Sequence, residues 1–118
     1  MENIRLESEI VEVGGIEVLQ LRGEIDVYTA PDLKSVVSGM IAEGINHVII
    51  DMTQVSYMDS SAFGVLLSAL KNVKPSGGSV NLARCNASIE KILGLTKLDT
   101  IFVLHKTLED AIASAKSA

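Results

Sequence analysis

The strongest constraint on the fold is a short run of apolar and β-branched residues at positions 47–52, His-Val-Ile-Ile-Asp-Met. The run lacks the alternation of polar and apolar residues that marks a strand with one face in water, so it is typical of a central strand covered on both faces. Upstream, apolar residues recur at helical spacing instead, as at Leu33, Val37 and Met40. A buried strand among amphipathic helices predicts an α/β fold.

Turn and capping signals divide the rest of the chain into elements. Gly14 and Gly15 suit a tight hairpin turn between two strand-like stretches. Thr29 and Thr107 each open a capping-box pattern, which marks the start of a helix. Together these signals predict strands at about residues 4–13, 16–22, 47–52, 79–83 and 101–104, and helices that begin after Thr29, near Ser60, after Asn86 or Ser88, and after Thr107.

The order β-β-α-β-α-β-α-β-α predicts a single α/β domain over residues 1–118. We expect a mixed, mostly parallel sheet of about five strands with about four helices, and an N-terminal antiparallel hairpin that forms one edge. Two loops, residues 24–29 and 56–60, follow strands and precede helix N-termini. Because α/β folds place their sites at the carboxyl ends of parallel strands, we expect Asp26 and Ser60 to lie on the same rim.

Composition narrows the possible functions. The chain has 118 residues, 47% of them apolar, which suffices for one packed core. With 10 basic and 15 acidic residues the net charge is -5, which opposes non-specific attraction to nucleic acid or anionic lipid. Residues 1–7 lack the apolar core of a secretory signal and no run approaches a membrane span, so we expect a cytoplasmic protein without membrane insertion. Cys85 is expected to be a small buried hydrophobic residue.

Motifs for catalysis and for cofactors are absent from the sequence. Neither the Gly-x-Ser-x-Gly signature of α/β hydrolases nor a glycine-rich nucleotide-binding loop occurs. His47 and His105 are expected at the start of the central strand and just after the last strand, which does not favour a triad with Ser60. One cysteine and no acidic cluster at ligand spacing make a metal site unexpected. We therefore expect a protein that is not an enzyme and binds no cofactor.

The step Asp59-Ser60-Ser61 stands between a strand-like run and an amphipathic helix. Aspartate and serine are preferred N-cap residues, so the simplest interpretation is that the step caps the helix. The same position also lies among the unpaired N–H groups at the positive end of the helix dipole, where a phosphate is well accommodated. Ser60 and Ser61 are therefore candidate switch residues.

The segment around this step is similar to a known family. Residues 55–67, with Leu-Arg-Gly-Glu-Ile-Asp at residues 21–26 and the pair Gly-Gly at residues 77–78, resemble the STAS domain of bacterial anti-sigma factor antagonists. In that family the first serine after the aspartate is the phosphoacceptor, and the matching position is Ser60. The family's usual Asp-Ser-Ser-Gly-Leu-Gly appears here with Ala62 and Phe63 as departures.

The resemblance implies a regulator of transcription that works by partner switching. The unmodified protein would bind an anti-sigma factor that is also an ATP-dependent serine kinase, and so free the sigma factor. Phosphorylation at Ser60 would end the association, and a serine phosphatase is a further partner that such a cycle admits. The expected partner-binding residues are Asp26, Tyr28, Thr29, Met58, Asp59, Ser60 and Ser61.

Some of these residues have structural alternatives. Asp26 precedes Thr29 closely enough to pin its own turn through its side chain. Tyr28 and Met58 fit either exposed anchors beside the serine or residues of the core, and counting with period two does not decide.

Two other functions fit parts of the sequence. One is a STAS scaffold subunit of a stress-signalling or transport complex without a phosphorylation cycle, since fold alone does not settle function. The other is a receiver-like domain phosphorylated on Asp51, which follows a buried run. The leading hairpin and the few carboxylates available for Mg²⁺ weigh against this second alternative.

Overall fold

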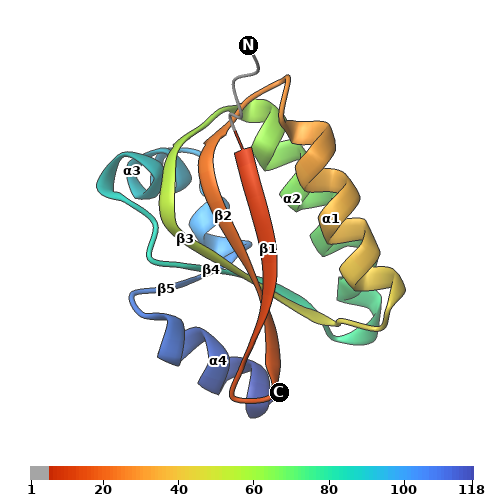
Figure 1. Ribbon diagram of the computed structural model, residues 1–118. Coiled ribbons are helices and arrows are strands. Elements are labelled where there is room, and N and C mark those ends of the chain that lie inside the picture. The colour runs from red at the N-terminus through yellow and green to blue at the C-terminus, as the bar shows by residue number, and fades with distance from the viewer. Residues whose placement is uncertain (1–5) are drawn as a thin grey trace.

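The computed structural model describes residues 6–118 and shows within them a five-stranded sheet with helices on both faces (Figure 1). The strands lie side by side in chain order. β1 pairs antiparallel with β2, whereas the other neighbouring strands are parallel. The predicted mixed sheet with an antiparallel edge is therefore confirmed, although residues 4 and 5 of the first predicted strand lie outside the described residues. The strands are β1 (Leu6–Val13), β2 (Ile16–Ile25), β3 (His47–Met58), β4 (Ser79–Ala83) and β5 (Val103–His105).

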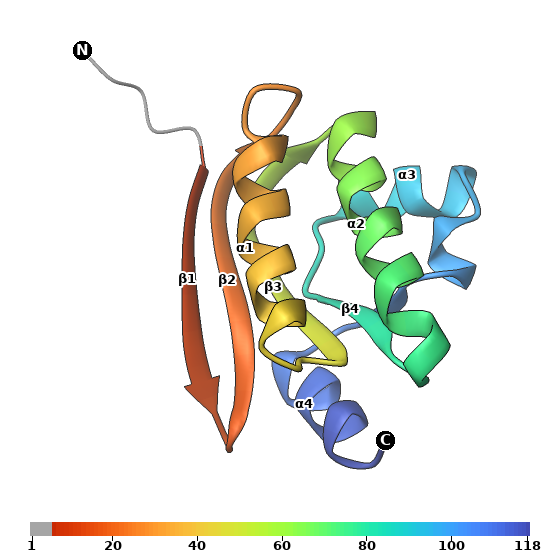
Figure 2. The ribbon, with the colours of Figure 1, turned by 90° about the vertical axis from the view of Figure 1, so that its right-hand side faces the viewer.

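Four α-helices occur in this part of the chain and cover the sheet unequally (Figures 1 and 2). They are α1 (Ala30–Ala42), α2 (Ser60–Val73), α3 (Ala87–Leu95) and α4 (Leu108–Lys116). The buried side chains of α1, α2 and α3 join one large apolar cluster with one face of the sheet. On the other face, α4 buries Ala111 and Ile112 against Val18, Ile49 and Ala83. The second face is thus only partly covered.

The turn between β1 and β2 is the tight hairpin turn that the sequence predicts. Gly14 and Gly15 have φ angles of 60° and 83°, both in the left-handed region. Two successive positive φ angles define the turn whose twist matches that of antiparallel strands, and glycine adopts them without strain.

Two strands run further than the sequence predicts. β2 continues to Ile25 rather than ending near Arg22, and β3 continues to Met58, so residues 56–58 are strand rather than loop. The added residues pair with one another, with Ile25 opposite Met58. Register shifts between the two strands interrupt the alternation of side chains there, which explains why a regular period does not reveal these strand ends.

The last strand differs slightly from its predicted bounds. β5 begins at Val103 and not at residue 101, because residues 98–100 form a 3₁₀ turn, η2 (Leu98–Thr100). Phe102, which follows the turn, is buried in the core. In α2 the large apolar side chains Phe63, Leu66, Leu70 and Val73 are buried, whereas Leu67 is exposed.

Cys85 is half-buried rather than fully buried. Burial raises the pKa of its thiol to about 12, and the nearby carboxylate of Glu90 adds to the effect. The reactive thiolate is therefore scarce at neutral pH, which fits the expected structural role.

Asp51 lies inside β3 and not at a strand end. It pairs with Gln20 on one side and Ala83 on the other, and its carboxylate accepts hydrogen bonds from the backbone and hydroxyl of Thr53. A receiver-like acceptor has to stand at the carboxyl end of its strand, so the position of Asp51 does not support that alternative.

A tight contact at Gly78 yields a stability prediction. A Cβ atom at this position would overlap the backbone oxygen of Asn46 and the Cβ of Val73, neither of which is a flexible side-chain end. We expect Gly78→Ala to lower the free energy of unfolding by about 2 kcal/mol through overpacking, measured by urea denaturation. Gly39→Ala is the control: it lies on α1 with open space around it, and we expect it to raise stability by about 0.5–1 kcal/mol. Equal midpoints for the two variants would contradict the prediction.

Candidate functional site

Asp59 caps α2 and sets the position of Ser60. The Asp59 backbone is extended, and its Oδ1 accepts hydrogen bonds from the N–H of Ser61 at 2.9 Å and of Ala62 at 3.4 Å. These bonds satisfy donors that the first helical turn would otherwise leave unpaired. The capping interpretation is confirmed for Asp59. Ser61 is not the cap, and Ser60 is the first residue of the helix.

Asp26 holds the loop between β2 and α1 by an Asx turn. Its Oδ1 accepts hydrogen bonds from the N–H of Tyr28 at 2.9 Å and of Thr29 at 3.1 Å. The alternative that Asp26 pins its own turn is therefore confirmed. The carboxylate also lies at the rim, immediately after the end of β2.

The predicted capping box at Thr29 does not form. Thr29 is the N-cap of α1 by position, but its hydroxyl donates to the carbonyl of Glu24 at 2.9 Å and accepts from the N–H of Asp26 at 2.9 Å. The N–H of Asp32 instead bonds to the backbone carbonyl of Thr29. The Thr29 side chain therefore stabilises the loop rather than the helix, because its hydroxyl already bonds to two backbone groups of the loop.

The two loops are joined to each other. The backbone N–H of Asp59 donates to the carbonyl of Ile25 at 3.1 Å, one residue beyond the pairing of Ile25 with Met58. Asp26 and Asp59 therefore follow paired residues on adjacent strands. The prediction that Asp26 and Ser60 share a rim is confirmed.

A third segment reaches the same end of the sheet. Asn86, and not Ser88, caps α3 by accepting a hydrogen bond from the N–H of Ile89 at 2.8 Å. Its amide donates to the carbonyl of Val55 at 3.2 Å, which ties α3 to β3 close to the rim. The sequence indicates the cap but not this second role.

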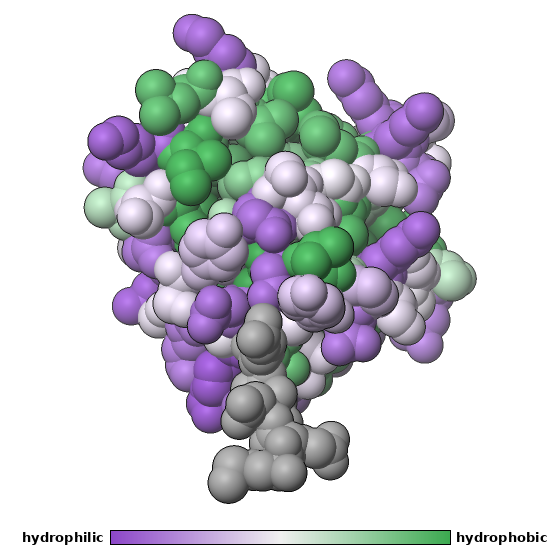
Figure 3. Space-filling view, turned by 90° about the horizontal axis from the view of Figure 1, so that it is seen from above, coloured by the Kyte–Doolittle hydropathy of each residue, from purple (hydrophilic) through white to green (hydrophobic). Residues whose placement is uncertain are grey.

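Exposed apolar and aromatic side chains lie at the same end of the sheet as Ser60. Tyr28 is 78% exposed, Val27 is 59% exposed and Tyr57 is 49% exposed, and Ser60 itself is exposed. Figure 3 shows this end from above, with apolar side chains on the surface among polar ones. We call Val27, Tyr28, Tyr57 and Ser60 the Ser60 rim.

The predicted partner-binding residues divide into exposed and buried groups. The Tyr28 side chain is exposed, whereas Met58 is 2% exposed and Thr29 is 6% exposed. Met58 therefore belongs to the core, and Thr29 is a buried residue whose hydroxyl holds the loop through hydrogen bonds to Glu24 and Asp26. Sequence reasoning missed Val27 and Tyr57, because Val27 lies in a loop and the register shifts between β2 and β3 interrupt the alternation of side chains before Tyr57.

The two departures from the family motif lie beneath the surface. Ala62 and Phe63 are both buried against the sheet. Both side chains therefore belong to the core of the protein and not to its surface.

The histidines take no part in this site. His47 starts β3, at the end of the sheet opposite to Ser60, and its Nδ1 lies 2.8 Å from the hydroxyl of Ser79. His105 Nε2 lies 2.9 Å from the amide oxygen of Asn81, and burial lowers the pKa of the imidazole. Within residues 6–118, no group of three His, Cys, Asp or Glu side chains is placed to hold a metal ion.

Comparison with known proteins assigns the family. A family model described as the STAS domain matches residues 7–111, so the chain belongs to the STAS domain family, as the sequence resemblance indicates. The anti-sigma-B factor antagonist of Bacillus subtilis is 32% identical over 94 residues, which cover 80% of this chain and 85% of that protein.

Two solved structures show the same fold. An anti-sigma factor antagonist from Mycobacterium paratuberculosis superposes with a TM-score of 0.84 at 24% identity, over 94% of each chain. The Bacillus cell fate determinant SpoIIAA in its phosphorylated form gives a TM-score of 0.70 at 23% identity, over 92% of this chain and 98% of that one. Between residues 6 and 118, no helix has both the length and the apolar character needed to cross a bilayer.

The Asp59 cap leads to a second prediction. Replacing Asp59 with alanine removes the acceptor for the first turn of α2, and we expect a loss of about 1 kcal/mol in the free energy of unfolding. Asp59→Asn is the matched control, since asparagine caps helices as well as aspartate does and should stay close to the unsubstituted protein. Chemical denaturation followed by circular dichroism compares the three. A loss of equal size in both variants would show that the charge, and not the cap, stabilises the junction.

Proposed function

We propose that this protein is an anti-sigma factor antagonist that regulates transcription by partner switching in the cytoplasm. In this proposal the unphosphorylated form binds an anti-sigma factor with serine kinase activity through the Ser60 rim and frees the sigma factor. Phosphorylation of Ser60 ends the association, and a serine phosphatase restores the binding form. The chain thus acts as a regulator and as the substrate of a kinase rather than as an enzyme.

The observation that carries the proposal is the exposed position of Ser60 at the first turn of α2, beside exposed apolar side chains. Ser60 is exposed although its neighbours Asp59 and Ser61 are partly buried. Tyr28 and Val27, on the adjacent loop, offer the aromatic and apolar area that partner interfaces favour. The kinase's target and the docking surface therefore coincide.

Local electrostatics explain how a phosphate would oppose binding. Phosphorylation adds about -1.5 to -2 charge at pH 7. The N–H groups of Ser61 and Ala62, which would otherwise help to neutralise a phosphate, already donate to the carboxylate of Asp59. The new charge therefore stays directed outward, next to Asp59, and a partner that covers it has to remove its water.

The resemblance to characterised antagonists supports the same proposal. The relative from Bacillus subtilis is named an anti-sigma-B factor antagonist, and SpoIIAA has been solved in a phosphorylated form.

A charge substitution at Ser60 tests the switch. We expect Ser60→Asp to weaken binding of the anti-sigma factor from the same cells about tenfold or more, because it places a negative charge in the apolar interface. Isothermal titration calorimetry measures the binding, and thermal unfolding checks that the fold is intact. Ser38→Asp, on the exposed face of α1, adds the same charge elsewhere and should bind normally. A folded Ser60→Asp variant that binds as tightly as the unsubstituted protein would refute the switch.

Mapping of the phosphosite accompanies this test. Incubation with ATP and the anti-sigma factor, followed by mass spectrometry, should find phosphate on Ser60 in the unsubstituted protein and in Ser61→Ala, and none in Ser60→Ala. Absence of modification with a kinase shown to be active would favour a STAS scaffold that binds without being switched.

Tyr28 gives a separate prediction about the docking surface. Truncating an exposed aromatic side chain removes contact area from the interface, so we expect Tyr28→Ala to weaken binding about tenfold and to lower the free energy of unfolding by no more than about 1 kcal/mol. Val13→Ala, an exposed apolar residue at the hairpin end of β1, is the control and should change neither quantity appreciably. Equal affinities for the two variants would place the partner elsewhere.

A further inference from the structure

The outer edge of β1 is a second exposed surface, apart from the Ser60 rim. The strand is eight residues long and stands at the end of the sheet order, and within residues 6–118 its backbone pairs with β2 alone. On such an edge strand, alternate N–H and C=O groups point away from the sheet and are open to a further strand. Figure 2 shows this edge on the side of the molecule away from α2 and α3.

The hairpin that ends in this edge carries most of the net charge of the protein. Residues 6–25 contain five glutamates and one arginine, a net charge of -4 out of -5 for the whole chain. Glu7, Glu9 and Glu12 lie on β1 itself and are exposed. A second copy paired along β1 would bring glutamates close to glutamates, which disfavours self-association through this edge. The same charges attract a basic segment.

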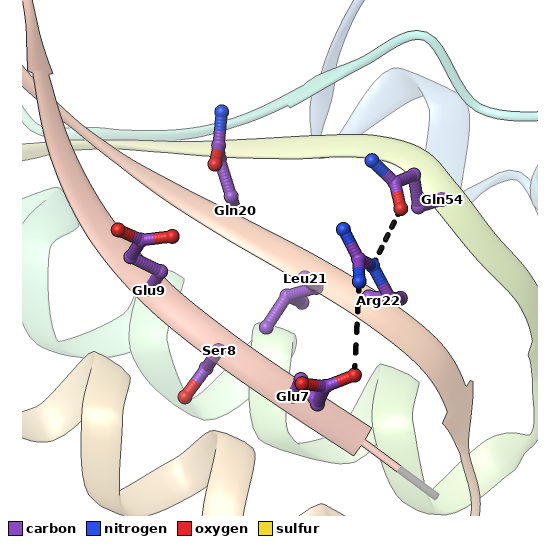
Figure 4. Close-up of a pocket in the computed structure, with 7 residues that line it drawn as sticks. All are labelled: Glu7, Ser8, Glu9, Gln20, Leu21, Arg22 and Gln54. Carbon is purple, nitrogen blue, oxygen red and sulfur yellow. Dashed lines mark hydrogen bonds and ion pairs between the residues drawn. The ribbon is translucent and has the colours of Figure 1, made fainter.

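A shallow cavity of about 160 Å³ lies along the same edge (Figure 4). Gln20 and Arg22 of β2 line the cavity. Their side chains lie on the same face of the sheet as that of Val18, which packs against α4 further along β2. α4 does not reach this part of the face, which is therefore uncovered. The cavity therefore opens directly beside the exposed edge of β1.

The charged groups in the cavity are only partly paired. Arg22 Nε donates to Gln54 Oε1 at 2.6 Å, and Arg22 Nη1 lies 3.9 Å from Glu7 Oε1. Glu9 and Gln20, which are opposite each other on β1 and β2, make no side-chain hydrogen bond or ion pair with the described part of the chain. A carboxylate and an amide oxygen are thus available to a cationic side chain.

We propose that the outer edge of β1 docks an extended, basic segment of a partner protein as an additional strand. The added strand forms backbone hydrogen bonds with the open groups of β1, and its alternate side chains lie beside Glu7 and Glu9. A lysine or arginine of the segment reaches into the cavity and donates to Glu9, a charge-assisted contact. This surface is distinct from the Ser60 rim, so it does not depend on the switch at Ser60.

A peptide of known sequence tests the docking edge. The probe is an octapeptide of alternating lysine and valine with blocked ends, added to the isotopically labelled full chain and followed by NMR. We expect amide shift changes concentrated in residues 6–13. Methylating alternate backbone nitrogens of the peptide keeps its charge but removes hydrogen-bond donors, and should weaken binding about tenfold.

Matched charge variants complete the test. Glu9→Lys and Glu43→Lys change the net charge equally, but Glu43 lies at the end of α1, away from the edge. We expect Glu9→Lys to weaken peptide binding about fivefold and Glu43→Lys to weaken it less than about twofold. Equal effects of the two variants, or undiminished binding of the methylated peptide, would show a merely acidic surface and overturn the proposal. Concentration-dependent shifts in β1 without peptide would overturn it in favour of a second copy as the occupant.

Discussion

The geometry of the Ser60 rim depends on Asp59, the single residue between β3 and α2. Its backbone N–H donates to Ile25, and its carboxylate accepts from the first turn of the helix. Strand end, neighbouring loop and helix start are therefore joined at one position. Because Asp59 takes the N-cap, Ser60 becomes the first helical residue and its hydroxyl is left outside. If Ser60 were itself the cap, its hydroxyl would turn inward toward backbone N–H groups and be lost to a kinase.

The unequal covering of the sheet separates the two proposed surfaces. α1, α2 and α3 bury one face and bring two loops of the rim to helix N-termini. The short α4 covers only part of the other face, which leaves the hairpin of β1 and β2 with an open edge and an uncovered flank. The rim is apolar with a serine that can gain charge, whereas the edge is permanently acidic. The two surfaces therefore suit partners of different chemistry.

Local rules predict much of this architecture, and non-local pairing accounts for most of what they miss. The glycine pair of the hairpin and the aspartate before α2 act through residues close in sequence, so their roles can be read from spacing. The ends of β2 and β3 depend on each other instead, since Ile25 is held opposite Met58 across the sheet. Thr29 follows a capping pattern, yet its hydroxyl accepts from the N–H of Asp26 and donates to the carbonyl of Glu24, so it bonds within the loop and not to the helix. The exposure of Tyr28 could not be derived from its neighbours either.

The balance of charge at Ser60 explains why a phosphate there should act on binding more than on folding. The dipole of α2 stabilises a negative group at its N-terminus by about 0.3–1 kcal/mol at the surface. Repulsion from Asp59 acts in the opposite direction, and two unit charges about 4 Å apart in water repel by near 1 kcal/mol. These two effects are of similar size and opposite sign, so the free protein changes little in stability. Once a partner excludes the water, the repulsion grows and the phosphate loses its hydration, which turns a nearly balanced group into a strongly unfavourable one.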